Sequence, residues 1–504
     1  MKAIFIIFFA LILVGCSTNK FANHQSKIFD LPVPARIQAL INNTDPHVNI
    51  GIKIVSLDNA KVLYEQNADR HFVPASTIKL ATVAAALYYL GPSYRFETNL
   101  FTESFDTTQG LINNLYLHGS GDPSLMDHDL IKLAHELKQQ NINTIQGNIY
   151  IDDFVFDNNL WTPGTMWDDR KFAFSAPLAG INLNYNRLEI KTLPAHKAQT
   201  QAHVIVRPQT SYVSVSTRAQ TTSEKSSKNL SLTIKNISEQ KTWAPNNNDG
   251  LSFGDHIFID GTIPSKAPPS YSLLAIKDPG LFAGTFLQEQ LQRQGIKFTG
   301  KILRKKIPYD AIKIASHQSR ALAEALIDFT KISLNLPNDA LIKAIAAQAG
   351  EKPATFTGGL KLVGEFLSRE VGIKDPMITV DGSGISRYNL ITPNQMLKIL
   401  LYAANNFSMG PEFLAAMPLA GQDGTLSARL MPLAGNIRAK TGTLANVSSL
   451  AGYYLGPRHQ RFAFTIFING FTGAAAKYAK LQDDILSALL PVKASEQRAF
   501  VRSY

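Results

Sequence analysis

A serine and a lysine placed one helical turn apart are the first residues in this sequence that could do chemistry together. Segment 74–79 reads Pro-Ala-Ser-Thr-Ile-Lys, and the residues that follow are apolar almost without interruption to Leu87. Side chains three positions apart share one face of a helix. A serine hydroxyl becomes nucleophilic when a base takes its proton, and a lysine in a desolvated site can be that base. The pattern favours Ser76 as a nucleophile activated by Lys79, although Ser-x-x-Lys alone also fits a capping serine beside a solvated lysine.

Two further short patterns follow downstream of Ser76 and Lys79. Ser-Leu-Asn occupies 333–335 and Lys-Thr-Gly-Thr occupies 440–443. The ordered trio Ser-x-x-Lys, Ser-x-Asn and Lys-Thr-Gly is the signature of β-lactamases and penicillin-binding proteins. Ser333 and Asn335 can extend a proton relay and hold a substrate amide. Lys440 supplies the positive charge that a substrate carboxylate seeks, while Gly442 lets an extended peptide approach a strand edge.

Composition narrows the class of protein. The chain has 504 residues, which is enough for two or three domains, and a net charge of +11 that is not gathered into a basic run. We interpret this charge as mild attraction to anionic surfaces such as a membrane or a cell-wall polymer. Nucleic-acid binding is not expected, because no basic block, zinc motif or RNP-like motif occurs. The eleven histidines show no metal-ligand spacing, so neither a metal nor another cofactor is expected.

The N-terminus has the pattern of an export signal. A short positive start, Met1-Lys2, precedes the apolar stretch Ala3–Leu13, which is too short to span a bilayer comfortably. Leu-Val-Gly-Cys at 13–16 then resembles a bacterial lipobox, so we expect a lipoprotein signal peptide over 1–15 and lipidation of Cys16, the only cysteine. The alternative is an ordinary secretory signal with an incidental cysteine. Both predict a periplasmic protein, and Ser17 favours the outer membrane in a two-membraned cell.

Hydrophobic periodicity predicts helices packed on an antiparallel sheet, hence an α+β fold or an α-β-α sandwich. The resemblance of the trio to β-lactamases and penicillin-binding proteins implies the serine β-lactamase/DD-peptidase-like form of this sandwich. Residues 16–31 are polar and irregular, which is typical of a tether. The main predicted elements are strands over Val48–Ile54, Val62–Tyr64, Val447–Leu455 and Phe462–Asn469, and helices over Leu281–Arg293, Ala321–Phe329, Asp339–Gln348, Pro393–Ala404 and about Ala474–Leu490.

A β-rich region interrupts this arrangement. Residues from about 195 to 275 are rich in Ser, Thr, Asn, Gln and Lys and contain alternating segments such as Tyr212–Val215 and Leu230–Ile234. This alternation predicts antiparallel sheet with one polar face. We therefore expect residues 32–95 and 280–504 to form the catalytic domain and residues 96–279 to form an inserted β-rich region of one or two subdomains.

About 250 residues separate Lys79 from Ser333, far more than a compact β-lactamase fold needs. With this long insertion the chain resembles the class C low-molecular-mass penicillin-binding proteins, the D-alanyl-D-alanine carboxypeptidase/endopeptidase type, over essentially the whole mature sequence. The resemblance also rests on these stretches: Leu90–Phe96, Gly119–Pro123, Phe174–Pro177, Asp381–Arg387 and Gly421–Leu426.

The resemblance implies a serine-type DD-peptidase that acts on peptidoglycan stem peptides. Ser76 would be acylated by the penultimate D-alanine carbonyl, with Lys79 as general base and Ser333 and Asn335 in the proton relay. Lys440 would help to bind the terminal carboxylate. β-Lactams would acylate the same serine as covalent inhibitors.

The family resemblance also assigns the residues that bind the substrate. Thr441 and Gly442 would contact its carboxylate and backbone, and the N–H groups of Ser76 and Thr443 would form the oxyanion hole. Asp169 is our hypothesis for a carboxylate that meets the free amine of the stem peptide; the alternative is a solvated loop acid.

Other functions remain compatible with the same motifs. A β-lactamase would differ by fast deacylation, and a protein of another class, a catalytically silent cell-wall-binding lipoprotein, could use the same fold. Both lysines of the trio are present, which argues against the silent form. Carboxypeptidase and endopeptidase activity cannot be separated, because both proceed through the same acyl-enzyme, and the oligomeric state stays open.

Overall fold

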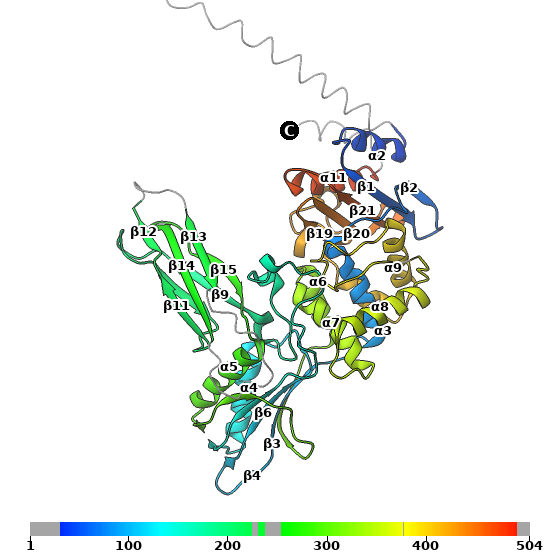
Figure 1. Cartoon of the computed structure of the whole chain (residues 1–504). Helices are drawn as coiled ribbons and strands as arrows, with labels where there is room; N and C mark the ends of the chain where they lie inside the picture. The colour runs from blue at the N-terminus through cyan, green and yellow to red at the C-terminus, as the bar shows by residue number, and fades with distance from the viewer. Residues whose placement is uncertain (1–30, 224–229, 237–253, 376, 491–504) are drawn as a thin grey trace, which may run out of the picture. The chain divides into compact units, whose positions relative to one another are not determined.

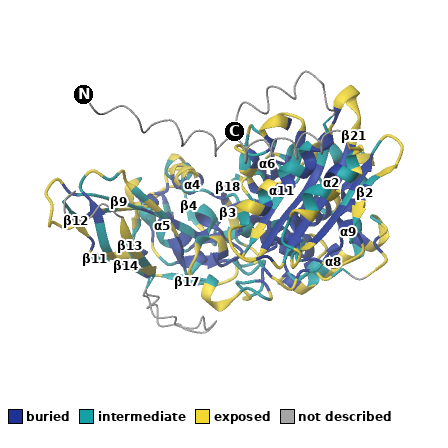
Figure 2. Ribbon diagram, turned by 90° about the horizontal axis from the view of Figure 1, so that it is seen from above, coloured by how far each residue is buried: buried dark blue, intermediate teal, exposed yellow. Residues whose placement is uncertain are grey.

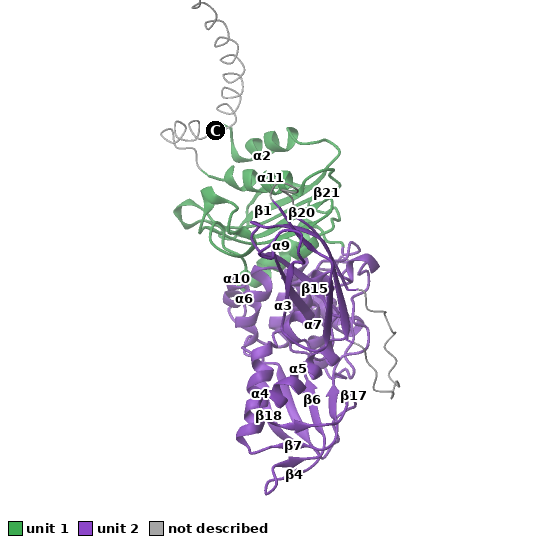
Figure 3. Cartoon of the chain, turned by 90° about the vertical axis from the view of Figure 1, so that its left-hand side faces the viewer, with its two compact units in different colours: residues 1–77, 390–405, 417–504 green, residues 78–389, 406–416 purple. Residues whose placement is uncertain are grey.

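The computed structural model describes residues 31–223, 230–236, 254–375 and 377–490. The expected signal peptide, Cys16 and the predicted tether up to residue 30 lie outside the described residues. Two compact units divide the chain (Figure 3): unit 1 contains residues 1–77, 390–405 and 417–504, and unit 2 contains residues 78–389 and 406–416. Among the described helices, none has the length and apolarity needed to cross a membrane.

Unit 1 is built on a five-stranded antiparallel sheet in the order β19-β20-β21-β1-β2. These strands are β1 (Asn49–Ser56), β2 (Val62–Gln66), β19 (Ile437–Leu444), β20 (Val447–Leu455) and β21 (Arg461–Asn469). The predicted hairpin at the start of the chain and the two predicted C-terminal strands are confirmed. Chain segments about 400 residues apart therefore pair, with Ile52 opposite Ile466.

Helices cover both faces of this sheet. Ile52 and its neighbours two positions away pack with α2 (Val33–Asn42) and α11 (Ala475–Ser487) in one apolar cluster. On the opposite face, a Cβ on Gly51 would lie within 3 Å of Phe72 and of Pro393, the first residue of α9 (Pro393–Asn405). Consecutive residues of a strand point to opposite faces of the sheet. Gly51 and Ile52 therefore show that helices cover both faces. Figures 1 and 2 show this α-β-α sandwich, with the strands largely buried. The α+β prediction is confirmed.

The helical part of unit 2 surrounds α3 (Lys79–Tyr89), which is buried from Lys79 to Leu87. It packs against α6 (Leu322–Lys331), α7 (Asn335–Gln348) and α8 (Phe356–Arg369), and the short α10 (Gly410–Ala415) also touches it. A helix that is apolar all round must be enclosed by others, as the sequence predicted. Two details differ from the prediction: α7 begins at Asn335, earlier than expected, and α8 was missed.

The rest of unit 2 contains a mixed sheet in the order β17-β8-β6-β3-β18, with α4 (Asp127–Gln139) and α5 (Pro279–Arg293) in the same apolar cluster. Its strands are β3 (Glu97–Thr102), β6 (Leu115–Gly119), β8 (Ile149–Asp152), β17 (Ile302–Arg304) and β18 (Ile312–Gln318). A small second sheet joins β4 (Phe105–Asp106), β5 (Leu111–Ile112), β7 (Thr144–Ile145) and β16 (Lys297–Phe298).

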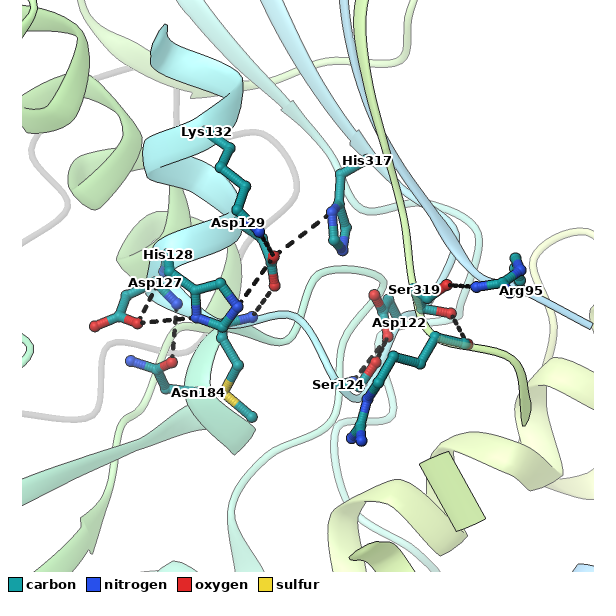
Figure 4. A network of polar contacts seen from close by, with 12 residues as sticks. Arg95, Asp122, Ser124, Asp127, His128, Asp129, Lys132, Asn184, His317 and Ser319 are labelled. Carbon is teal, nitrogen blue, oxygen red and sulfur yellow. Dashed lines mark hydrogen bonds and ion pairs between the residues drawn. The ribbon is translucent and has the colours of Figure 1, made fainter. Parts of the chain in front are cut away.

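Polar contacts close the N-terminal end of α4 (Figure 4). Asp129 accepts a hydrogen bond from the Met126 N–H at 3.1 Å, and its carboxylate lies 3.6 Å from His317 Nδ1. Nearby, Asp122 Oδ1 accepts from both the N–H and the hydroxyl of Ser124, at 2.8 and 2.7 Å. Such bonds from an aspartate to the residue two positions on stabilise a turn. This turn lies at the end of the Gly119–Pro123 stretch, directly before α4.

Two further sheets lie in the predicted β-rich region. One has the order β10-β9-β15, and the other joins β11, β12 and β13 to β14. Antiparallel pairing holds in the first sheet, but β11 and β12 pair with β14 in parallel, so the prediction of purely antiparallel sheet was wrong. Alternating polarity reports which face is buried and not the direction of the neighbouring strand. The bounds are β9 (Arg187–Leu193), β10 (His203–Arg207), β11 (Val213–Thr217), β12 (Gln220–Thr222), β13 (Ser231–Asn236), β14 (Asp255–Pro264) and β15 (Ser270–Ala275).

Candidate active site

Ser76 lies on a single 3-10 turn, η1 (Ala75–Ile78), that runs directly into α3, whose first residue is Lys79. The residue before it, Ala75, is fully buried and has a left-handed backbone with φ of 47°. A residue with a Cβ adopts this conformation only at a cost and where its surroundings enforce it. The strained turn presents Ser76 in a half-buried position at the start of the buried helix. The sequence predicted the helix but not this strain.

In unit 1, the predicted Lys-Thr-Gly segment lies on β19, next to the Ser76 turn. A Cβ built on Gly442 would lie 2.9 Å from the Ser76 nitrogen and 2.7 Å from the Pro74 oxygen. Ser449, which faces Gly442 across the β19–β20 pair, donates its hydroxyl hydrogen to the same Pro74 oxygen. Only glycine leaves room for this approach of strand to turn. The structure thus brings Ser76 and Gly442 together within one unit.

Lys440 and Thr441, the other two residues of this segment, differ in exposure. The Lys440 side chain is fully buried, and its ammonium donates to the Thr441 carbonyl oxygen at 2.8 Å. The Thr441 hydroxyl donates to the hydroxyl of Thr425 at 2.7 Å. Thr425 belongs to the Gly421–Leu426 stretch singled out in the sequence, where Asp423 accepts from the Leu419 N–H at 2.8 Å in a turn. The strand therefore carries a buried cation beside hydroxyl groups.

In unit 2, Lys79 and Asn335 are hydrogen-bonded. The Lys79 ammonium donates to Asn335 Oδ1 at 2.8 Å and also to the carbonyl oxygen of Ser383. Its side chain is fully buried. The two residues are 256 positions apart in the chain and meet because α3 and α7 pack together. The structure thus brings these two predicted site residues together within unit 2.

Two carboxyl groups lie around this lysine. Burial lowers the pKa of Lys79 to about 8, against the opposing attraction of Asp339 and Asp381. Burial, together with the charge of Asp381, raises the pKa of Asp339 to about 8. Asp381 accepts from the N–H groups of Gly384 and Ser386 at 2.7 and 2.6 Å. A lysine whose pKa lies near neutral pH exists in part as the free amine, which is the form that accepts a proton.

Ser333 lies in the turn between α6 and α7. Its backbone is left-handed, with φ of 61°, and its N–H donates to the Thr330 oxygen at 3.2 Å. Two of the predicted site residues thus adjoin or occupy strained backbone, Ser76 after Ala75 and Ser333 itself. Strain of this kind concentrates at functional sites.

Asn335, the first residue of α7, has its amide held from both sides. Besides accepting from Lys79, it donates through Nδ2 to the Phe174 carbonyl oxygen at 2.8 Å. Phe174 belongs to the same loop as Asp169, which is half-buried in the short turn η2 (Trp167–Asp169). Within the described part of the chain, no hydrogen bond or ion pair engages the Asp169 carboxylate. Among the described residues, therefore, no hydrogen bond or ion pair of this carboxylate joins it to the other predicted site residues.

Sequence reasoning missed Asp339 and the roles of the Asp381–Ser383 turn. Asp339 Oδ1 accepts from the Gly382 N–H at 3.0 Å, and the neighbouring Ser383 oxygen accepts from Lys79. The signal for Asp339 was available, because it follows Asn335 by four positions and so shares its face of the helix. Asp381–Arg387 was recognised only as a stretch typical of the family.

Comparisons with known proteins find a family and relatives that this chain resembles. The sequence model of the D-Ala-D-Ala carboxypeptidase 3 (S13) family matches residues 34–489. The chain is 30% identical to the D-alanyl-D-alanine carboxypeptidase of Actinomadura sp. (strain R39), over 84% of this chain and 78% of that protein. It is also 30% identical to D-alanyl-D-alanine carboxypeptidase DacB of Haemophilus influenzae, over 88% of this chain and 90% of that one. The crystal structure of penicillin binding protein 4 (dacB) from Haemophilus influenzae is similar, with a TM-score of 0.78, 27% identity, and coverage of 90% and 99%.

Proposed function

This chain belongs to the D-Ala-D-Ala carboxypeptidase 3 (S13) family, and we propose that it is a serine-type DD-peptidase that acts on peptidoglycan stem peptides through an acyl-enzyme. The terminal D-alanine, or the amine of a crosslink, is released as this intermediate forms, and water then hydrolyses the ester and regenerates Ser76. A relative, penicillin binding protein 4 of Haemophilus influenzae, has been crystallised with a β-lactam. We propose that β-lactams bind this chain as well and acylate Ser76.

Ser76 is the nucleophile in this proposal, and it attacks the carbonyl of the penultimate D-alanine. Lys79 takes the Ser76 proton as the C–O bond forms. Ser333 and Asn335 help to return a proton to the departing amine as the C–N bond breaks. The N–H groups of Ser76 and Thr443 stabilise the oxyanion, and such donors commonly make the largest contribution to acyl transfer.

The remaining predicted residues bind the substrate. Lys440 supplies charge for the terminal carboxylate, while Thr441 and Gly442 contact the carboxylate and the peptide backbone. Asp169 pairs with the free amine of the stem peptide. The unengaged carboxylate of Asp169 supports this last role, because an acid without a protein partner can pair with a ligand cation.

The observation that carries the proposal is the buried Lys79, bonded to Asn335 and with its pKa lowered to about 8. A lysine of ordinary pKa would be almost wholly protonated at neutral pH and could not accept the serine proton. Desolvation supplies the required free amine. A silent binding protein would have no need to bury this cation.

The N-terminal pattern supports a second, finer proposal about location. One relative of this chain is the D-alanyl-D-alanine carboxypeptidase DacB of the bacterium Haemophilus influenzae, which is consistent with export to act on peptidoglycan. We propose that Cys16 is lipidated after removal of residues 1–15 and anchors the protein to the outer membrane. Incorporation of labelled palmitate into the native chain, lost in Cys16→Ala, would support the anchor. A Cys16→Ala protein that fractionates with membranes as the native chain does would contradict it.

Penicillin labelling tests the enzymatic proposal. A soluble form that begins after Cys16 is incubated with a fluorescent penicillin beside Ser76→Ala, and label is followed on a gel over time. Stable label that is lost in the variant supports a DD-peptidase. Label that turns over within seconds favours a β-lactamase, and absence of label in both proteins contradicts the proposal. Release of D-alanine from a stem pentapeptide and cleavage of a crosslinked dimer then measure the two activities.

A further inference from the structure

One segment of unit 2, residues 157–175, is bound to α7 at two separate points, and we name it the strap. At its C-terminal end, the Phe174 carbonyl oxygen accepts from Asn335 Nδ2 at 2.8 Å. At its N-terminal end, the Lys343 ammonium donates to Asp157 Oδ1 at 2.6 Å and to the Asn159 oxygen at 2.9 Å. The strap therefore lies along one face of the helix that begins with Asn335.

The helix residues that face the strap follow a regular spacing. Asn335, Asp339 and Lys343 are separated by four positions each, so they lie on one side of α7. Eight residues of α-helix extend about 12 Å. Between the two bonded ends, Asp339 lines a small cavity together with strap residues Trp161 and Thr162. Strap residues therefore lie beside α7 at Lys343, at Asp339 and at Asn335.

Lys343 is buried as deeply as the proposed catalytic lysines. Its side chain has no exposed surface, and besides Asp157 its ammonium lies 4.3 Å from the centre of the Phe356 ring. Burying an ammonium is costly unless it is paired and hydrogen-bonded. These contacts fix the start of the strap, where the Asp157 N–H also donates to the Ala354 oxygen at 3.0 Å. Lys343 is therefore a strong anchor and not a surface cation.

A hydrogen bond within the strap connects its anchored start to its other end. Trp161 Nε1 donates to the Ser175 carbonyl oxygen at 3.0 Å, next to Phe174. The Arg170 guanidinium lies 4.5 Å from the centre of the same indole and 4.8 Å from that of Trp167. The start and the end of the strap are therefore bonded to each other close to the residue that contacts Asn335.

We propose that Lys343 is a positioning residue for the DD-peptidase reaction: by anchoring the strap it places the Phe174 carbonyl, which orients the Asn335 amide toward Lys79. This inference rests on the proposed function. An amide has an acceptor oxygen on one side and two donor hydrogens on the other. With Phe174 bonded to Nδ2, the oxygen must face the Lys79 ammonium. If the strap shifts, the Asn335 amide can rotate. Its NH2 group would then face the Lys79 ammonium, and two hydrogen-bond donors would meet without an acceptor.

The first test replaces Lys343 with methionine, which keeps an unbranched side chain but cannot pair with Asp157. We expect the penicillin acylation rate constant of the folded protein to fall by about tenfold or more, because small displacements of positioning groups reduce rates strongly. The penicillin concentration for half-maximal rate should change less. Lys361→Met is the matched control, since Lys361 is exposed on α8, and it should acylate as the native protein does.

A purely structural role for Lys343 predicts a different result. It would lower the melting temperature but leave the rate constant of the folded, labelled fraction unchanged, and this outcome overturns the proposal. If Lys343→Met does not fold, Trp161→Phe removes the bond to the Ser175 oxygen and keeps a smaller aromatic ring beside Arg170. Its acylation rate constant should fall severalfold, and a native rate constant overturns the proposal equally.

The native protein and Ser76→Ala distinguish failure of the proposed function from failure of the positioning role of Lys343. If the native protein takes no label, the proposed function fails. If it is labelled through Ser76 while the Lys343→Met and Trp161→Phe proteins acylate at the native rate, only the positioning role fails.

Discussion

At the scale of single residues, the lowered pKa of Lys79 predicts how acylation depends on pH. Burial lowers this pKa to about 8, and only the free amine above it accepts a proton. The penicillin acylation rate constant should therefore rise with pH through a midpoint of about 8 and then level off. Stopped-flow measurement from pH 6 to 10 checks this.

Lys79→Arg should lose acylation by a factor of about 100 or more, because a guanidinium stays protonated. A rate that falls with rising pH over this range would contradict Lys79 as the base.

Asp339 predicts a pH dependence of stability. Its pKa is raised from 3.8 to about 8, so between these values the folded protein holds a proton that the unfolded chain has released. The Asp339 contribution to the free energy of unfolding is present in full at low pH and is lost as pH rises from about 4 toward 8, by at most about 1.4 kcal/mol per unit. Asp339→Asn removes this titration and keeps an oxygen for the Gly382 N–H.

The variant should therefore gain stability relative to the native protein as pH increases over this interval. Urea unfolding of both proteins at pH 5 and pH 8 measures the difference. Asp328→Asn, on the exposed side of α6, is a control that should show no such gain. An equal effect of Asp339→Asn at both pH values would mean that Asp339 is ionised in the folded protein.

At the scale of elements, Gly442 makes the approach of β19 to the Ser76 turn testable. Alanine at this position would place a Cβ 2.2 Å from Ser449 Oγ and 2.9 Å from the Ser76 nitrogen. Because two of the clashing atoms, on Pro74 and Ser76, are backbone, the strand or the turn must move. We expect Gly442→Ala to reduce the acylation rate constant at least about tenfold.

The matched control is Gly364→Ala on α8, where a Cβ would have nothing within 4 Å. It should acylate normally and stabilise the helix by up to about 1 kcal/mol, since glycine is a poor helix former. Fluorescent penicillin labelling and thermal unfolding of both variants provide the comparison. Native acylation by Gly442→Ala would show that the strand tolerates displacement.

The elements also show what the sequence could predict. Local periodicity located β1, β20, β21 and α5, and the spacing of Ser76 and Lys79 indicated their chemistry. The sequence pattern could not show that Lys343 contacts Asp157, 186 positions away, because that contact depends on how α7 packs against a loop. The left-handed backbone of Ala75 could not be predicted for the same reason, because tertiary contacts impose this conformation against the preference of the residue. Parallel pairing of β11 with β14 likewise depends on chain path.

At the scale of the whole chain, the arrangement of β9 and β15 offers a test of one part of the insertion predicted over residues 96–279, the segment from 193 to 269. Thr192 on β9 lies directly opposite Ser270 on β15 in an antiparallel pair, so their Cα atoms are about 5 Å apart. A short turn can therefore join them and replace residues 193–269 without stretching the rest of unit 2. The excised segment includes β10 to β14 but none of the residues assigned to catalysis or substrate binding.

We expect the excised chain to fold and to be acylated by penicillin within about threefold of the native rate constant, because distant, uncoupled changes leave the chemistry intact. It should be less stable, since Tyr212, whose ring centre lies 5.3 Å from that of Phe282 on α5, is removed and this buried face of α5 loses its cover. Stopped-flow acylation and thermal unfolding measure both effects. A folded, excised chain that takes no label would mean that the β-rich region contributes to the active site, and a chain that cannot fold would mean that this region is part of the core of unit 2 and not an insertion.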